Sequence, residues 1–125
     1  MDRKYVTLLA VLLTTVLVLV FAEEEEQYTS KYDDIDVHAI LANPKLRNQY
    51  LNCYLETGPC VTADAKYFKV RFPEIIATRC KKCTEKQVQF LDAVTTWYVE
   101  NEPDTWKLVI DTALQELNKG QNTEK

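Results

Sequence analysis

Apolar residues recur three and four positions apart in several separate stretches after residue 33, which is the spacing of one face of an α-helix. The clearest stretches place on one face Leu46, Tyr50, Cys53 and Tyr54, and further on Val88, Leu91, Val94 and Tyr98. Lys, Glu, Gln, Ala and Leu fill the positions between them and favour helix. Only two glycines and four prolines interrupt the chain, and the Asn-Gly and Asp-Gly pairs typical of β-hairpins are absent. The pattern predicts an all-α domain.

Capping residues and prolines set the expected limits of the helices. In the first half of the domain we expect three helices. The first covers 35–42 and is capped by Asp34, and the second runs from Pro44 to the Gly58-Pro59 turn. The third covers 63–72 and is capped by Thr62. Pro73 predicts a kink or break, followed by a short helix at 74–79. Later helices are expected from a Thr84/Gln87 capping box onward and from Pro103 to about 117, ended by Asn118-Lys119-Gly120.

The first 22 residues have the order of a secretory signal peptide. A charged start precedes an apolar run from Val6 to Phe21, and Val20 and Ala22 are compact residues at the positions of a cleavage site. The alternative is a membrane anchor, but a spanning helix needs about 20 apolar residues and this run is shorter. We therefore expect 1–22 to be removed, 23–33 to form an acidic N-terminal arm, 34–118 to form the helical domain, and 119–125 to be a polar tail.

The charge of the expected mature chain restricts its partners. Without Asp2, Arg3 and Lys4 it carries 13 basic and 18 acidic side chains, a net charge of −5. Nucleic acid and anionic membrane surfaces repel such a chain. We expect a secreted, extracellular monomer with no stable membrane insertion.

Four cysteines are the candidates for cross-linking, spaced as Cys53-x6-Cys60 and Cys80-x2-Cys83. Three pairings are open. The local pairing, Cys53–Cys60 and Cys80–Cys83, is the simplest because a Gly-Pro turn and one helical turn bring each pair within reach. A redox site is disfavoured because no βαβ pattern surrounds it. A zinc site is disfavoured because only one pair has ligand spacing and a secreted chain is oxidised, so we expect two disulfides and no metal.

Short motifs are spread from residue 28 to about residue 110. They read Tyr28-Thr-x-Lys-Tyr32-Asp-x-Ile35, Ile40-Leu-Ala-Asn43, Cys53-x6-Cys60 with Gly58-Pro59, Cys80-x-Lys82-Cys83-Thr-x-Lys-Gln87, and Asn101-Glu followed by Trp106. Together with the signal peptide, this set resembles the insect chemosensory proteins, also called the OS-D or A10 family, which includes ejaculatory bulb-specific proteins. Each motif alone is weak, and the set is specific.

The resemblance implies a compact bundle of five to six short helices around an apolar channel, with two local disulfides. It also implies binding of small hydrophobic molecules such as odorants, pheromones, fatty acids or other lipid-like ligands. By position, Tyr50 and Trp106 would lie in the pocket, and Tyr28 and Tyr32 at the channel mouth. The chain departs from the family pattern in three places: one extra residue between the second and third cysteines, Ala65 in place of a glycine, and the lack of a C-terminal Tyr-Asp-Pro stretch that supplies the last helix.

Apolar side chains on the helical faces can be packed core or the wall of a cavity, since both use the same residue types. Tyrosine and tryptophan favour the cavity, because their polar tips can orient a ligand head group. Besides Tyr50 and Trp106, the candidate ligand-binding residues are Leu46, Phe68, Ile75, Val88, Leu91, Val94 and Ile110. We expect Tyr54, Tyr67 and Tyr98 to lie partly at the surface.

Catalytic residues in a recognisable pattern are absent. The sole histidine, His38, is expected in an exposed helix, no Gly-x-Ser-x-Gly occurs, and the thiols are consumed in disulfides. The sequence therefore favours a carrier of small hydrophobic molecules that is not an enzyme and needs no cofactor. The alternative is a secreted interaction or structural protein with a filled core, whose partner is a receptor or another extracellular protein.

Overall fold

Five α-helices and one 3-10 turn make up the part of the chain that the computed structural model describes, residues 26–123. The elements are η1 (Ser30–Tyr32), α2 (Val37–Ala42), α3 (Pro44–Tyr54), α4 (Ala63–Thr78), α5 (Glu85–Asn101) and α6 (Pro103–Thr123). The predicted all-α bundle of five to six helices is confirmed. The predicted signal peptide lies outside the described residues. Within 26–123 no helix is long and apolar enough to cross a membrane.

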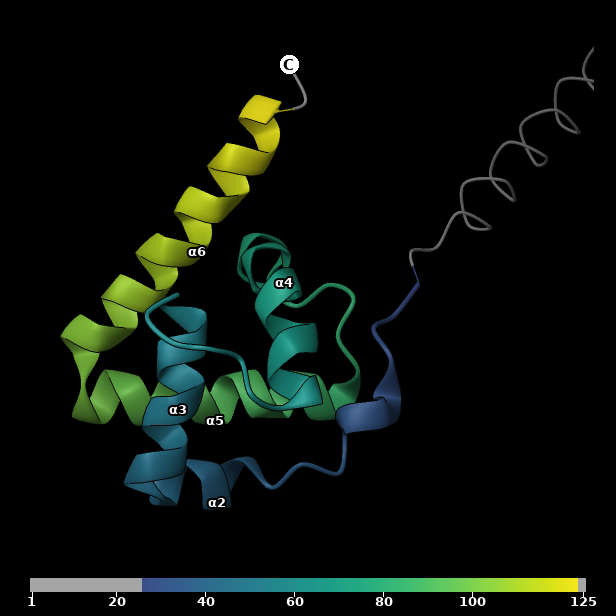
Figure 1. The fold of residues 1–125 in the computed structure, drawn as a ribbon. Coiled ribbons are helices and arrows are strands. Elements are labelled where there is room, and N and C mark those ends of the chain that lie inside the picture. The colour runs from purple at the N-terminus through teal and green to yellow at the C-terminus, as the bar shows by residue number, and fades with distance from the viewer. Residues whose placement is uncertain (1–25, 124–125) are drawn as a thin grey trace, which may run out of the picture.

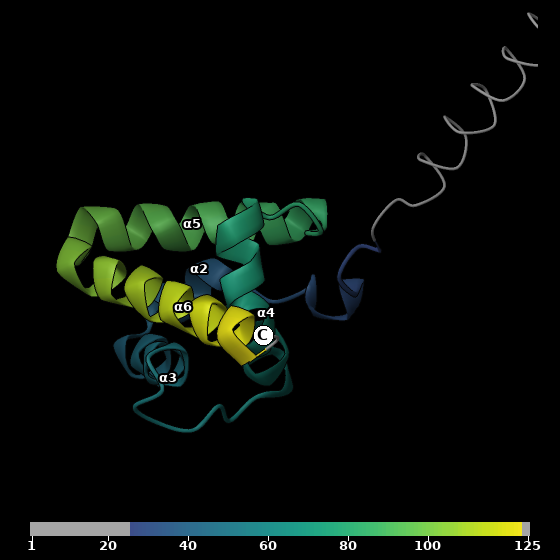
Figure 2. The same cartoon turned by 90° about the horizontal axis from the view of Figure 1, so that it is seen from above.

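The helices are arranged around a common centre (Figures 1 and 2). In Figure 1, α5 lies across the lower half of the molecule, α4 stands above it, and α3 crosses in front of it and extends below it to the level of α2. After a sharp turn, α6 leaves the end of α5 and contacts both α3 and α4, while the short α2 contacts α3 and α5. Each helix therefore turns one face inward, which is why the amphipathic pattern of the sequence is so regular.

Side-chain caps begin α3, α4 and α5 where the sequence predicts them. The Asn43 Oδ1 atom accepts a hydrogen bond from the Leu46 amide, with Pro44 in the first turn of α3. Thr84 and Gln87 form the predicted capping box of α5, in which each side chain accepts a hydrogen bond from the other's backbone amide. These local bonds satisfy amides that have no partner inside their helix.

Two of the predicted limits before residue 80 are wrong. Asp36, and not Asp34, caps α2, because the Ile35 amide still donates to the Tyr32 carbonyl in the preceding turn. Pro73 does not break α4, which runs from Ala63 to Thr78 as one helix. The proline removes one backbone donor, but cavity-lining residues lie on both sides of it, so tertiary packing holds the two halves in a single helix.

The predicted end of the last helix is also wrong. We expected it to end at Asn118-Lys119-Gly120, whereas α6 continues to Thr123. Gly120 lies on the surface, and a Cβ atom placed there would meet open space. A glycine at an exposed helical position costs about 1 kcal/mol relative to alanine, which weakens a long helix without ending it.

Two local disulfides join Cys53 to Cys60 and Cys80 to Cys83, with Cα–Cα distances of 4.8 and 5.0 Å, so the predicted pairing is confirmed. The second disulfide forms a buried cluster with Ile75 at the junction of α4 and α5. The junction is therefore held both by a covalent bond and by apolar packing.

The N-terminal arm is attached to this same junction. The Tyr28 amide donates to the Lys82 carbonyl at 2.8 Å, and the Tyr28 hydroxyl donates to Glu74 Oε1 at 2.9 Å. The buried Gln87 side chain donates to the Thr29 carbonyl at 2.8 Å. The described part of the arm, from residue 26 to residue 33, is thus tied to α4 and α5 by directed hydrogen bonds.

Replacing both junction cysteines in the double variant Cys80→Ser/Cys83→Ser lowers the free energy of unfolding by about 2 kcal/mol, the loop-closure contribution of so short a ring. Urea unfolding followed by circular dichroism measures it. Reduced wild-type protein is the control and must be less stable still, since it lacks both disulfides. A variant as stable as the oxidised wild type would contradict the prediction.

Candidate ligand cavity

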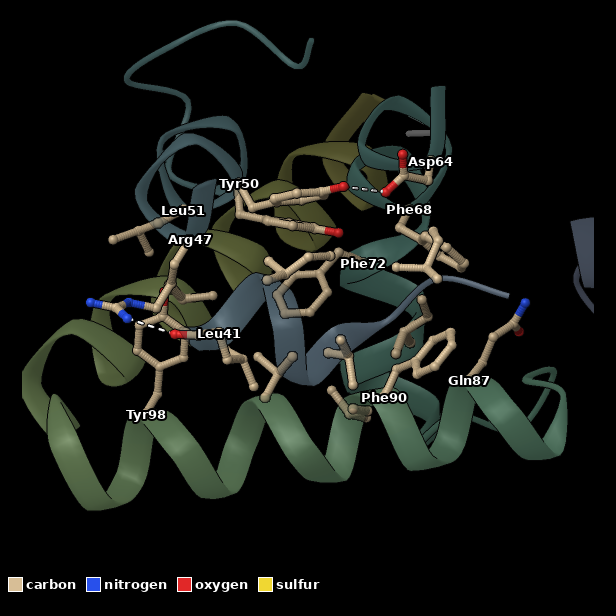
Figure 3. Close-up of a pocket in the computed structure, with 18 of the residues that line it drawn as sticks. Leu41, Arg47, Tyr50, Leu51, Asp64, Phe68, Phe72, Gln87, Phe90 and Tyr98 are labelled. Atoms are coloured by element: carbon tan, nitrogen blue, oxygen red, sulfur yellow. Dashed lines mark hydrogen bonds between the residues drawn. The ribbon is translucent and has the colours of Figure 1, made fainter. Parts of the chain in front are cut away.

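An apolar cavity of about 170 Å³ lies between all five helices. Its walls are supplied by side chains from α2, α3, α4, α5 and α6, some of which are labelled in Figure 3. Ile35 and the buried Cys80–Cys83 disulfide complete the lining. Aromatic and aliphatic groups dominate these walls, with a few polar groups among them. This composition is typical of sites for small organic ligands.

Six of the nine predicted ligand-binding residues line this cavity: Tyr50, Phe68, Ile75, Leu91, Val94 and Trp106. The other three are not among the lining residues. Leu46 and Ile110 are half-buried elsewhere in the bundle, and Val88 is 39% exposed. Helical periodicity identified the inward face of each helix but not which of its residues reach the centre.

The two tyrosines predicted at the channel mouth lie behind the cavity wall. Tyr28 packs against the buried disulfide cluster. The Tyr32 ring contacts the rings of Tyr67 and Phe68, with centroid distances of 5.4 and 6.0 Å. Since Phe68 itself lines the cavity, the arm supports the wall from outside.

Several lining residues were missed from the sequence. Tyr98 was expected partly at the surface but is only 5% exposed, so that prediction is wrong. Its helical spacing from Val94 and Leu91 was the signal that could have placed it. Tyr54, Phe72 and Phe90 also line the cavity. Arg47 and Asp64 were missed because hydropathy assigns charged residues to the surface.

A tyrosine–carboxylate pair forms one polar part of the wall. The Tyr50 hydroxyl donates to Asp64 Oδ2 at 2.7 Å (Figure 3). Burial raises the pKa of Tyr50, a hydrogen bond with the Thr62 side chain partly offsets this, and the hydrogen bond to Asp64 raises the pKa again. Tyr50 therefore stays a neutral donor with its proton engaged by Asp64.

A second polar part lies near Tyr98, whose ring is stacked on Trp106 with centroids 5.8 Å apart and planes 19° apart. Burial raises the pKa of Tyr98, the Glu102 charge also raises it, and the Arg47 charge partly offsets this. Figure 3 shows Arg47 and Tyr98 at one end of the cavity and Asp64 toward the other. The two ends therefore differ in charge.

Gln87 belongs to a third part of the wall and is 4% exposed. Its side-chain amide points away from the cavity, toward the arm that it binds (Figure 3). The polar atoms of Gln87 have their hydrogen-bond partners outside the cavity, so only its hydrocarbon portion borders the cavity.

Among residues 26–123 no cluster of metal-binding side chains occurs.

The fold and cavity define a class: small helical proteins with two local disulfides and an internal apolar site. A profile of the family described as "Insect pheromone-binding family, A10/OS-D" matches residues 28–120. Ejaculatory bulb-specific protein 3 of Drosophila melanogaster is 40% identical over 97 residues, which is 78% of this chain and 76% of that protein. Allergen Tha p 1 of Thaumetopoea pityocampa is 38% identical over 99 residues, 79% of this chain and 78% of that protein.

A solved structure described as a chemosensory protein in complex with bromo-dodecanol superposes with a TM-score of 0.62 and 38% sequence identity. The match covers 65% of this chain and 80% of that one. This chain belongs to the insect A10/OS-D family, the chemosensory proteins.

Tyr54 gives the cavity wall a measurable pH dependence. Burial raises its pKa above the usual value of about 10. In the unfolded chain the phenol ionises near pH 10, whereas in the folded protein it stays neutral to higher pH. Its contribution to stability is therefore complete below about pH 10 and is lost as pH rises toward the folded pKa. Urea unfolding at increasing alkaline pH should show a shallower loss of stability in Tyr54→Phe than in the wild type, and equal slopes would contradict this.

Proposed function

We propose that this protein is a secreted carrier that binds small, mainly hydrophobic molecules in its central cavity. The observation that carries the proposal is an apolar space to which each of the helices α2 to α6 contributes and which the side chains of the described residues leave open. Membership of the chemosensory family and the alcohol complex of a structural relative support it.

Transfer out of water supplies the affinity. At about 25 cal/mol per Å², an alkyl chain that buries about 300 Å² gains about 7 kcal/mol before entropic costs, which is consistent with micromolar binding. The observed cavity is close in size to the ~150 Å³ engineered cavity that binds benzene. A longer chain therefore requires rearrangement of the wall, and half-buried aromatic side chains such as Phe72 and Phe90 are the ones placed to move.

Secretion is supported by cysteine usage. All four cysteines are in disulfides and none is free, which is typical of proteins from oxidising compartments. The predicted signal peptide agrees with this.

The alternative of a protein–protein interaction module with a filled core is less well supported, because the centre of the bundle is open. Catalysis is also less well supported. His38 is exposed and lies outside the cavity, so no nucleophile–base pair is built around it.

Ligand binding should quench the fluorescence of one tryptophan selectively. Trp106 lines the cavity and Trp97 does not. We expect dodecanol to change the emission of Trp97→Phe, in which Trp106 remains, and to leave Trp106→Phe nearly unaffected. Equal responses of the two variants would indicate binding outside the cavity.

Filling part of the cavity should weaken binding. Val94→Phe places extra volume inside it, and a ligand that loses about 60 Å² of burial loses about 1.5 kcal/mol, or about tenfold in affinity. Val88→Phe adds the same volume at an exposed position of the same helix and serves as the control. Displacement of an apolar fluorescent dye by dodecanol measures both. Failure of dodecanol to displace the dye from the wild type would contradict the carrier function.

A further inference from the structure

A groove on the surface of the molecule lies between α2 and α5 and is separate from the central cavity. It has a volume of about 580 Å³ and is open to solvent. Its lining includes the buried Leu41, the small residues Ala42 and Ala93, and the half-buried Trp97. Small side chains in a groove between two helices allow the side chains of a third element to enter, because the distance between packed helices depends on the residues at the contact.

The Trp97 ring is held in place from the inner side of this groove. The Arg47 Cζ atom lies 4.0 Å from the centre of the ring, and the Arg47 Nη1 atom donates to the Leu41 carbonyl at 2.7 Å. Arg47 lines the central cavity, Trp97 lines the groove and Leu41 lines both. The three residues therefore separate the two spaces. The guanidinium fixes the indole, which presents a rigid apolar surface to the groove.

The side chains of the groove that carry a charge at neutral pH are acidic. Asp92 and Glu100 project from exposed positions of α5, and none of the described residues that line the groove is a lysine or an arginine. Among residues 26–123 neither carboxylate is in an ion pair. The surrounding segment 87–118 contains six acidic residues and one basic residue. The negative field of this segment attracts a positively charged partner to the groove.

The spacing of the two carboxylates indicates the shape of that partner. Asp92 and Glu100 are eight residues apart in one helix, so their Cα atoms are separated by about 12 Å along the helix axis. In a partner helix that lies along α5, basic residues seven positions apart are separated by about 10.5 Å and can reach both carboxylates. An apolar residue four positions after the first basic residue shares their face and lies between them, beside Ala93 and Trp97.

We propose that the α2–α5 groove binds a basic amphipathic helix of a partner protein. Two lysine or arginine side chains of that helix pair with Asp92 and Glu100, and an apolar side chain between them packs on Trp97. Recognition of a helix in a groove uses anchors at such i, i+4 and i+7 positions. The inference does not depend on the proposed carrier function, because the lining residues of the groove, Leu41 apart, are not among those of the cavity.

The test uses Trp106→Phe, in which Trp97 is the remaining tryptophan. The probe is an alanine-based helical peptide in which a leucine follows a lysine by four positions and a second lysine follows it by seven. This peptide should change the emission of Trp97, with an affinity that falls as salt is added. Calorimetry with the wild-type protein repeats the titration without the substitution.

The same peptide with glutamate in place of both lysines should bind at least about fivefold more weakly, since two attractive ion pairs are replaced by repulsion. Equal binding of the two peptides would overturn the proposal. Absence of any binding of the lysine peptide to the wild type would also overturn it.

Two double variants locate the binding. Asp92→Asn/Glu100→Gln should weaken binding of the lysine peptide about fivefold, through the loss of two exposed ion pairs. Asp104→Asn/Asp111→Asn is the matched control, because it removes two carboxylates from exposed positions of α6 outside the groove. It should keep the affinity within about twofold. Equal weakening in the two variants would assign binding to overall charge and overturn the role of the groove.

Other occupants of the groove give different results. Trp97 emission that depends on protein concentration without peptide, together with a sedimentation coefficient that rises with concentration, would identify a second copy of this chain as the occupant. Spermidine that changes Trp97 emission as strongly as the peptide at the same concentration would identify a small cation. Either result would overturn the assignment of a helical partner.

Discussion

The structure depends on five apolar helix faces meeting around a centre that their side chains do not fill. Short helices at varied angles cannot close on one another as two long parallel helices can. Aromatic residues such as Tyr54, Phe72 and Trp106 supply much of the wall around this centre. The open centre is therefore bordered by all of these helix faces, and it is the space in which we propose that ligands bind.

One corner of the bundle fixes the helices around this centre. The Cys80–Cys83 disulfide, Ile75 and the capping box at the start of α5 determine where α4 ends and α5 begins. The arm adds Tyr28 to the same cluster and binds Gln87 from outside. Covalent, apolar and hydrogen-bonding contacts therefore converge on one corner of the cavity wall.

Charge distinguishes the two ends of an otherwise nonselective apolar site. A hydrocarbon surface discriminates weakly between chains of similar length, since each methylene contributes less than about 1 kcal/mol. Polar groups make the two ends differ: Asp64 engages Tyr50 at one end, and Arg47 lies near Tyr98 at the other.

The sequence by itself determined the elements and the cross-links. These features depend on residues close together in the sequence, so they can be recognised without knowledge of the fold. They are the helical periodicity, the Asn43 and Thr84 caps and the spacing of the cysteines. Only the tertiary structure decided that α4 continues through Pro73, that Val88 is exposed although it shares a helical face with Leu91, and that Arg47 is among the residues that line the cavity. The reason is that each of these depends on a neighbour distant in the sequence, whose packing outweighs the local preference.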